Sequence, residues 1–84
     1  MKKAVALRYN PEEAAPKVIA KGAGNIAEKI LENAASSGVP IHEDAALAES
    51  LEKIDLERYI PKELYEVVAQ VLVYIDRLDR ASVR

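Results

Sequence analysis

Apolar residues along this chain form short β-branched runs and helix-spaced stripes, and residues 17–43 show both patterns in succession. Residues 17–21 are a β-branched run, and Gly22 and Gly24 follow it as turn residues. From Asn25 the apolar residues recur at three- and four-residue spacing, which is typical of an amphipathic helix. The members of this stripe are Ile26, Ala27, Ile30, Leu31 and Ala34.

The predicted helix ends at residues 36–38, where Gly38 suits the left-handed position that follows many helices. Residues 39–42 predict a second short strand. Two strands joined by a helix of this length are expected to run parallel, with a right-handed crossover. The helix has to lay its apolar stripe on the sheet, because nothing else in 84 residues could cover that stripe.

The flanking segments supply another strand and a short helix. Residues 4–9 predict a mostly buried strand, and residues 10–16 a loop, because Asn-Pro favours turns and a residue before proline is held extended. A loop of this length suits an antiparallel link to the strand at 17–21. Asp44 can cap a helix whose apolar face carries Leu47, Leu51 and Ile54. Residues 55–60 fit either a helical turn or a loop.

Pro61 is expected at the first position of the last helix, which extends to about Leu78. Its inward stripe consists of Leu64, Val68, Val71, Leu72, Ile75 and Leu78. Residues 81–84 are expected to fray. The pattern therefore predicts one α/β domain over residues 1–84, with a small mixed β-sheet of about three strands in the order β-β-α-β-α-α.

The composition of the chain excludes several classes of function. The chain contains no cysteine, which excludes a disulfide framework and a thiolate metal site. Its net charge is −2 with acids and bases interspersed, so no basic patch for nucleic acid is expected. No apolar run reaches the ~18–20 residues of a membrane span. We expect no direct membrane insertion and a cytoplasmic location.

The turn at Gly22-Ala23-Gly24-Asn25 matches the start of a G-x-G-x-x-A motif between a strand and a helix, and acidic residues follow about twenty positions later. This match makes a small nucleotide- or phosphate-binding α/β domain an alternative function for the chain. The alternative is that the glycines only let the chain reverse before the helix. His42 is the only histidine, so a catalytic or zinc site has little support. We expect no catalytic residues, no cofactor and no metal.

The apolar surface of the last helix is wider than one contact needs. Part of Tyr65, Ala69, Leu72 and Val73 could remain exposed as a protein-binding patch. The other interpretation is that all of these residues belong to the core.

Several segments together resemble the cytoplasmic domain of the FlhB/YscU-type export-switch family of flagellar and injectisome type III secretion. The matching segments are residues 4–9, 15–24, 26–27, 39–41, 47–48 and 60–72, with Leu51 between the last two. The resemblance implies a small mixed sheet surrounded by helices. It also implies a role in selecting exported substrates, through a hydrophobic patch at the positions of Ala15, Pro16, Ala69 and Leu72.

Members of that family carry a membrane domain and cut themselves at Asn-Pro-Thr-His, and neither feature is present in these 84 residues. Asn10-Pro11 follows the first strand in a different context, so the chain is expected to stay intact. It resembles stand-alone FlhB-like proteins, which lack the family's first strand. The sheet edge left by that strand is expected to be covered or paired by another segment, or to stay open.

These observations favour a non-enzymatic protein-binding module in type III export, with export-substrate or export-apparatus proteins as partners. Its place would be the cytoplasm, free or at the cytoplasmic face of the membrane through an export apparatus. The sequence leaves open the oligomeric state, the substrates, and whether the chain replaces, assists or competes with a full-length FlhB. A third alternative is that this chain is a subunit that supplies the missing half of a membrane partner.

Overall fold

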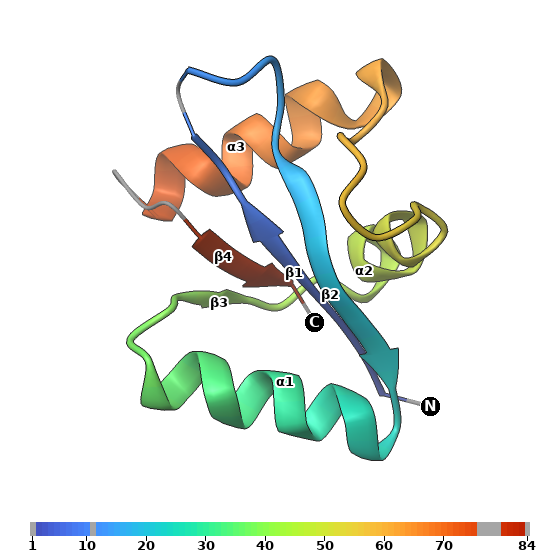
Figure 1. Ribbon diagram of the computed structural model, residues 1–84, viewed down its shortest axis with the longest axis vertical. Helices are drawn as coiled ribbons and strands as arrows, with labels where there is room; N and C mark the ends of the chain where they lie inside the picture. Colours follow the sequence, from blue (N-terminus) through green and yellow to red (C-terminus); the bar gives the residue numbers. More distant parts are fainter. Residues whose placement is uncertain (1, 11, 76–79, 84) are drawn as a thin grey trace.

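A four-stranded sheet lies between helices on its two faces in the computed structural model, which describes residues 2–10, 12–75 and 80–83 (Figure 1). The chain order is strand, strand, helix, strand, helix, 3-10 turn, helix, strand. The elements are β1 (Lys3–Arg8), β2 (Lys17–Ala23), α1 (Asn25–Ser36), β3 (Ile41–His42), α2 (Ala45–Glu52), η1 (Lys62–Leu64), α3 (Tyr65–Ile75) and β4 (Arg80–Val83).

The strands lie in the order β2-β1-β4-β3. β1 runs antiparallel to both β2 and β4, and β3 runs parallel to β4. β2 and β3 therefore point the same way, as the intervening helix predicted, but β1 and β4 lie between them. The mixed α/β class is confirmed, with four strands in place of about three. No helix of the described segments is long and apolar enough to span a membrane.

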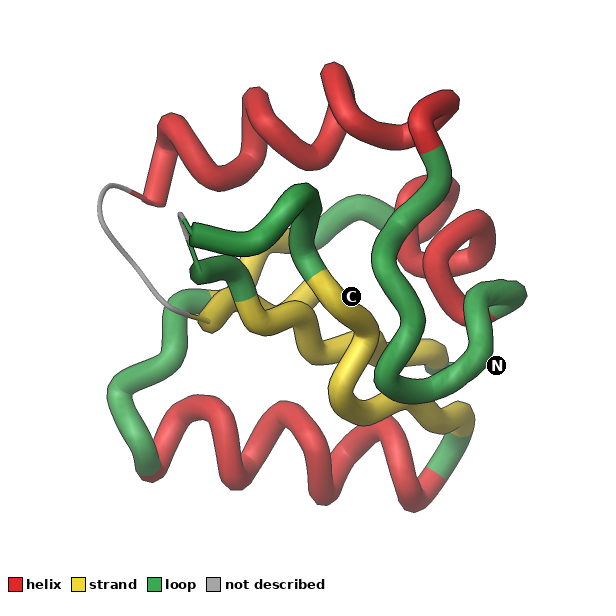
Figure 2. Tube along the Cα trace, turned by 45° about the horizontal axis from the view of Figure 1, so that its top comes forward, coloured by secondary structure: helices red, strands yellow, loops and turns green. Residues whose placement is uncertain are grey.

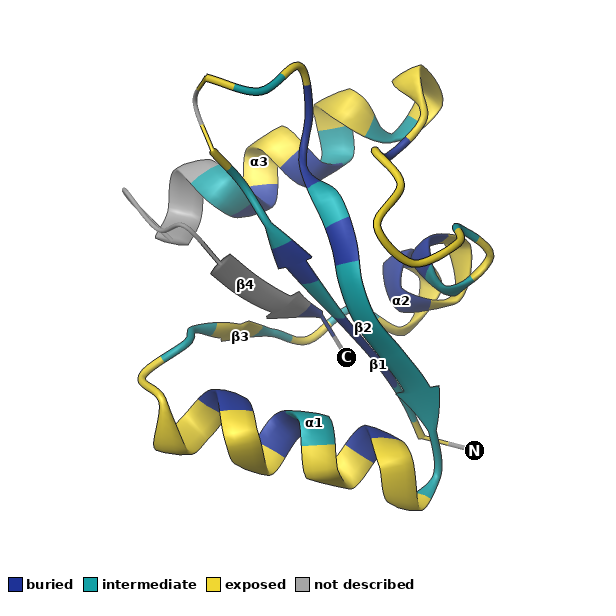
Figure 3. Cartoon of the chain, viewed as in Figure 1, coloured by how far each residue is buried: buried dark blue, intermediate teal, exposed yellow. Residues whose placement is uncertain are grey.

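The two faces of the sheet carry separate cores, as alternation along a strand requires. On β1, Val5 and Leu7 point to the face covered by α2 and α3, and Ala4 points to α1. Figure 2 shows α1 on one side of the strands and α3 on the other. The buried positions of α1 face the sheet and its exposed positions face away (Figure 3).

The end of α1 forms as its sequence predicts. Gly38 has φ 72°, and the N–H groups of Gly38 and Val39 donate to the carbonyls of Ala35 and Ala34 at 3.3 and 2.8 Å. This pair of bonds is the Schellman arrangement, which satisfies carbonyls left free at a helix end. The predicted stripe is buried at Ala27, Leu31 and Ala34 and half-buried at Ile30, whereas Ile26 is 59% exposed.

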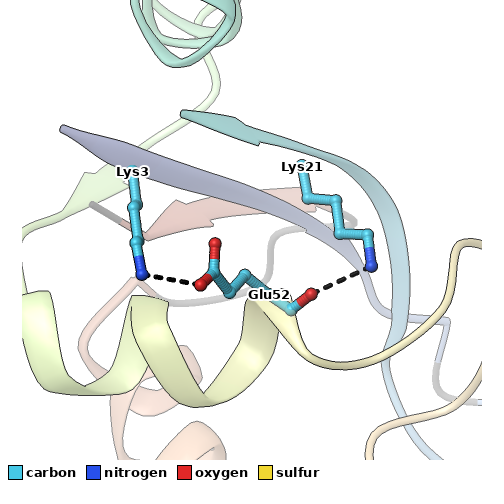
Figure 4. A network of polar contacts seen from close by, with 3 residues as sticks. All are labelled: Lys3, Lys21 and Glu52. Carbon is cyan, nitrogen blue, oxygen red and sulfur yellow. Dashed lines mark hydrogen bonds and ion pairs between the residues drawn. The ribbon is translucent and has the colours of Figure 1, made fainter. Parts of the chain in front are cut away.

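Asp44 caps α2 as predicted, since its Oδ1 accepts a hydrogen bond from the Leu47 N–H at 3.0 Å. The other end of α2 is fixed by two lysines from the sheet (Figure 4). Lys21 Nζ donates to the carbonyl oxygens of Glu52 and Ile54 at 2.9 and 2.8 Å, and Lys3 Nζ contacts Glu52 Oε1 at 2.6 Å. The hydrogen bond that Lys3 donates to the Glu52 carboxylate raises the pKa of Lys3 above its ordinary value. The helix is thus tied to both β1 and β2.

Residues 55–60, which the sequence left open, form a turn and then pair with β2. The Val18 N–H donates to the Arg58 carbonyl at 3.1 Å, and the Val18 carbonyl accepts from the Glu57 N–H at 2.7 Å. Glu57 has a φ of 64°, the left-handed conformation that few non-glycine residues adopt. The edge of β2 is therefore covered at its first residues.

Two predictions about the last third of the chain need correction. Pro61 is extended and precedes the 3-10 turn, so α3 itself begins at Tyr65. Residues 81–83 do not fray: they lie in β4, and Val83 is fully buried against the core. The predicted helix positions beyond Ile75, including Leu78, and the tail position Arg84 lie outside the described residues.

Candidate protein-binding surface

Helix α3 has a core side and an outer side. Val68 and Val71 are buried in the larger core, and Leu64 and Val67 pack against it. Tyr65 is 40% exposed, and Ala69, one turn further, is also exposed. Residues four apart are neighbours on a helix surface. The exposed side of α3 therefore carries an aromatic residue followed by a small one.

Leu72 lies at the border between the two sides of α3. It is half-buried and packs against the larger core, and it is the third residue after Ala69. The exposed Ala69 and the partly exposed Leu72 are therefore neighbours on the surface of the helix. We call Tyr65, Ala69 and Leu72 the α3 surface. The sequence also suggested Val73 for this patch, but its side chain is not among those that the structure describes.

The loop before β2 is held in place by its own hydrogen bonds. Asn10 Oδ1 accepts from the Glu12 N–H at 3.0 Å, and the Asn10 carbonyl accepts from the Glu13 N–H at 2.8 Å. These bonds form a turn of the kind that asparagine favours. At the end of the loop, the Pro16 carbonyl accepts from the Ile60 N–H at 2.9 Å. The loop end is thereby fixed to the segment that precedes α3.

The four residues of the predicted patch fall into two environments. Ala15 is only 3% exposed and belongs to the same core cluster that Leu72 packs against. Pro16 is buried as well, whereas Ala69 is exposed. The structure therefore brings the loop and α3 together at the core, and the part that faces solvent belongs to α3.

A second group of exposed apolar side chains was not singled out from the sequence. Leu56 is 52% exposed and Tyr59 is 44% exposed, on the segment that runs along β2. Lys17 Nζ lies 5.0 Å from the centre of the Tyr59 ring and 3.6 Å from a carboxylate oxygen of Glu13. The apolar residues of segment 55–60 show no regular spacing in the sequence. Only the pairing of this segment with β2 shows which of its side chains face outwards.

The glycine turn is occupied by contacts within the chain. Gly24 has φ 61° and ψ −126°, and its N–H donates to the Lys2 carbonyl at 2.7 Å. A β-carbon added to Gly22 would collide with the Ile26 side chain. Glu28 places a carboxylate in the first turn of α1, where a bound phosphate would meet its negative charge. These contacts favour the role of the glycines in turning and packing the chain.

The described part of the chain shows no candidate metal site. Residues 2–10, 12–75 and 80–83 contain no group of three or more His, Asp and Glu side chains that could hold a metal ion. His42 is half-buried on the two-residue strand β3. The outer side of α3 is therefore the feature of this structure that best fits a functional surface.

Comparison with known proteins gives the family context. Residues 1–75 match the FlhB HrpN YscU SpaS family. The protein YlqH of Bacillus subtilis is 42% identical over 82 residues, which cover 96% of this chain and 88% of YlqH. The hypersensitivity response secretion protein HrcU of Ralstonia nicotianae is 43% identical over 76 residues, 89% of this chain.

The chain spans only 21% of HrcU, so that relative is a much longer protein. The crystal structure of the cytoplasmic domain of FlhB from Shewanella putrefaciens superposes with a TM-score of 0.82 at 39% sequence identity. That superposition covers 87% of this chain and 61% of the FlhB chain. The family match, the two relatives and the solved structure confirm the resemblance inferred from the sequence.

Proposed function

Because this chain belongs to the FlhB HrpN YscU SpaS family, we propose that it is a non-enzymatic protein-binding module of a flagellar or type III export system. The family supports the link to export. The partner we infer is an export-substrate or export-apparatus protein that offers an apolar segment. We assign the chain to the cytoplasm, either free or at the cytoplasmic face of the membrane, by analogy with the cytoplasmic domain of FlhB.

The observation that carries this proposal is the exposure of Ala69 on α3, a helix that is apolar or aromatic at every position except Glu66 and Gln70. An alanine leaves room for a partner side chain to approach the helix backbone. Tyr65 adds aromatic area next to it, and aromatic side chains contribute strongly to protein interfaces. Leu72 would close the contact on the following turn.

The buried residues of the predicted patch take a supporting part in this proposal. Ala15 packs in the core under α3, and Pro16 bonds through its carbonyl to Ile60. Proline restricts the backbone, so the loop end loses little entropy when a partner binds. Ala15 and Pro16 would thus keep α3 in position while Ala69 and Leu72 meet the partner.

The test is the variant Ala69→Asp, with Ala46→Asp as its matched control on an exposed position of α2. Both variants should unfold within ~0.5 kcal/mol of the parent protein, because exposed substitutions rarely cost more. For a domain of this size that is roughly 2–4 °C in melting temperature. Each protein is then used as bait in cells that assemble a flagellar or type III apparatus.

Export-apparatus or export-substrate proteins should be recovered with the parent chain and with Ala46→Asp, and lost with Ala69→Asp. If Ala69→Asp unfolds the protein, residue 69 belongs to the core and the α3 surface is wrongly defined. If the stable variant still recovers the same proteins, the α3 surface does not bind them.

A further inference from the structure

Three cationic residues from three neighbouring strands occupy one row across the sheet. Arg8 of β1 is in register with Lys17 of β2 and with Arg80 of β4. These residues are far apart in the sequence, so only the strand pairing brings them together. Like charges directly opposite one another in paired strands are destabilising. The stability of the sheet therefore does not explain why this row is cationic.

The face of β1 that carries Arg8 is the one under α1, and the helix covers only the first part of it. Side chains alternate along a strand, so Ala4, Ala6 and Arg8 share this face. Ala4 is buried in the cluster with α1, whereas Ala6 and Arg8 are half-buried. The α3 surface belongs to the helix on the other side of the sheet (Figure 2). Part of Arg8 is therefore accessible on the side of the sheet opposite α3.

The charges of this row are only partly compensated by the described residues. Lys17 Nζ lies 3.6 Å from a carboxylate oxygen of Glu13. No described residue forms an ion pair with Arg8, because the ion pairs of the described segments involve lysines alone. A guanidinium group binds a carboxylate through two parallel hydrogen bonds, which makes arginine well suited to recognising acidic side chains. Arg8 therefore offers a site for a carboxylate from outside the chain.

Tyr59 extends the row with an exposed aromatic ring. It pairs with Lys17 through an isolated bridge, and Lys17 Nζ lies 5.0 Å from the centre of its ring. Tyr59 is 44% exposed, so the ring can also contact a partner. Cationic groups beside an apolar ring fit a segment in which carboxylates lie next to an apolar side chain.

We propose that Arg8, Lys17 and Tyr59 form a second interaction surface, which binds an acidic segment of a partner protein. Carboxylates of that segment pair with Arg8 and Lys17, and an apolar side chain of the segment packs against Tyr59. The chain has a net charge of −2, so the rest of its surface would repel a long polyanion such as nucleic acid, whereas a short acidic segment meets only this row. This surface is independent of the α3 surface, because the two lie on opposite sides of the sheet.

The experiment uses the full chain and a fluorescent peptide, Glu-Glu-Leu-Glu-Glu-Gly, with a control peptide in which glutamine replaces each glutamate. Fluorescence anisotropy at low salt should show saturable binding of the acidic peptide, and the control should bind at least about tenfold more weakly. Arg8→Gln and Lys17→Gln should each weaken binding by about threefold or more. Lys29→Gln removes the same charge from an exposed position on α1 and should leave binding unchanged. Glu13→Gln should strengthen binding, because it releases Lys17.

The melting temperature separates a binding role of Arg8 from a structural one. Arg8→Gln relieves a contact between like charges, so the melting temperature should rise or stay within about 2–4 °C of the parent value. A larger fall would make Arg8 a structural residue and overturn the proposal. Absence of saturable binding, equal binding of both peptides, or unchanged binding to Arg8→Gln would overturn it as well. Tighter binding of a single-stranded oligonucleotide with the same number of negative charges would make nucleic acid the occupant and overturn the assignment to a protein segment.

Discussion

Both faces of the sheet are covered by helices through apolar contacts, but the two faces use side chains of different size and number. Among the described residues, the face under α2 and α3 buries eleven hydrophobic side chains in one cluster, mostly valine, leucine and isoleucine. On the face under α1, the described residues form a smaller cluster of Ala4, Ala27 and Leu31, with Ile30 packed against it. Small residues let α1 lie close to the strands but bury little apolar area, so most of the stability should come from the other face.

The same comparison explains where an exposed apolar surface arises. α1 has a narrow stripe, and the sheet covers most of it. α3 has apolar residues around more of its circumference, and the core covers only one side. Among the α3 side chains that the structure describes, Tyr65 and Ala69 are apolar and face solvent, where another protein could contact them.

The largest expected effect is that of a charge in the larger core. Val68 is 1% exposed, so Val68→Asp would bury a carboxylate without a partner. This should cost several kcal/mol, a large part of the ~5–15 kcal/mol that stabilises a typical domain. Circular dichroism should show an unfolded or strongly destabilised protein. An unchanged melting temperature would mean that α3 presents a different side to the sheet.

A pair of leucine substitutions compares the two faces directly. Leu51 on α2, which is fully buried, and Leu31 on α1, which is 8% exposed, are each replaced by alanine. Leucine-to-alanine changes in cores cost ~2–5 kcal/mol, and we expect Leu51→Ala near the top of this range and Leu31→Ala near the bottom. Urea denaturation measures both, with the exposed Leu56→Ala as control. Equal losses would show that the face under α1 contributes as much as the face under α2 and α3.

The smallest effects concern two ion pairs, one between β1 and α2 and one between the residue before β1 and α1. Lys3 and Glu52 meet at 2.6 Å and are half-buried, whereas Lys2 and Glu28 are 3.9 Å apart and exposed. Glu52→Gln should lower the melting temperature slightly at neutral pH, and Glu28→Gln less, because exposed pairs contribute little.

The raised pKa of Lys3 predicts how the stabilising effect of the Lys3–Glu52 pair changes at alkaline pH. Its stabilising effect is fully present below the pKa of an unfolded lysine, ~10.4, and is lost as the pH rises through the higher pKa of the folded state. The difference between the parent and Glu52→Gln should therefore shrink above that pH. A difference that stays constant through the alkaline range would mean that charge pairing is not its cause.

The sequence by itself determined the features that depend on neighbouring residues. Asp44 caps α2 and Gly38 ends α1 through hydrogen bonds that span only a few positions. The spacing of apolar residues identified the inward side of α3, including Val68 and Val71. These predictions hold because short-range geometry decides them.

Only the tertiary structure decided how the sheet is completed and which apolar residues remain exposed. β4 is a strand because β1, near the other end of the chain, offers partners for its main chain, and no local pattern in residues 80–83 indicates this. Ala15 and Pro16 are buried because the loop end pairs with Ile60 and lies in the core, while Ala69 stays exposed because no element covers that side of α3 in the described structure. Burial and strand pairing are properties of distant segments brought together, so a sequence pattern narrows them but the packing determines them.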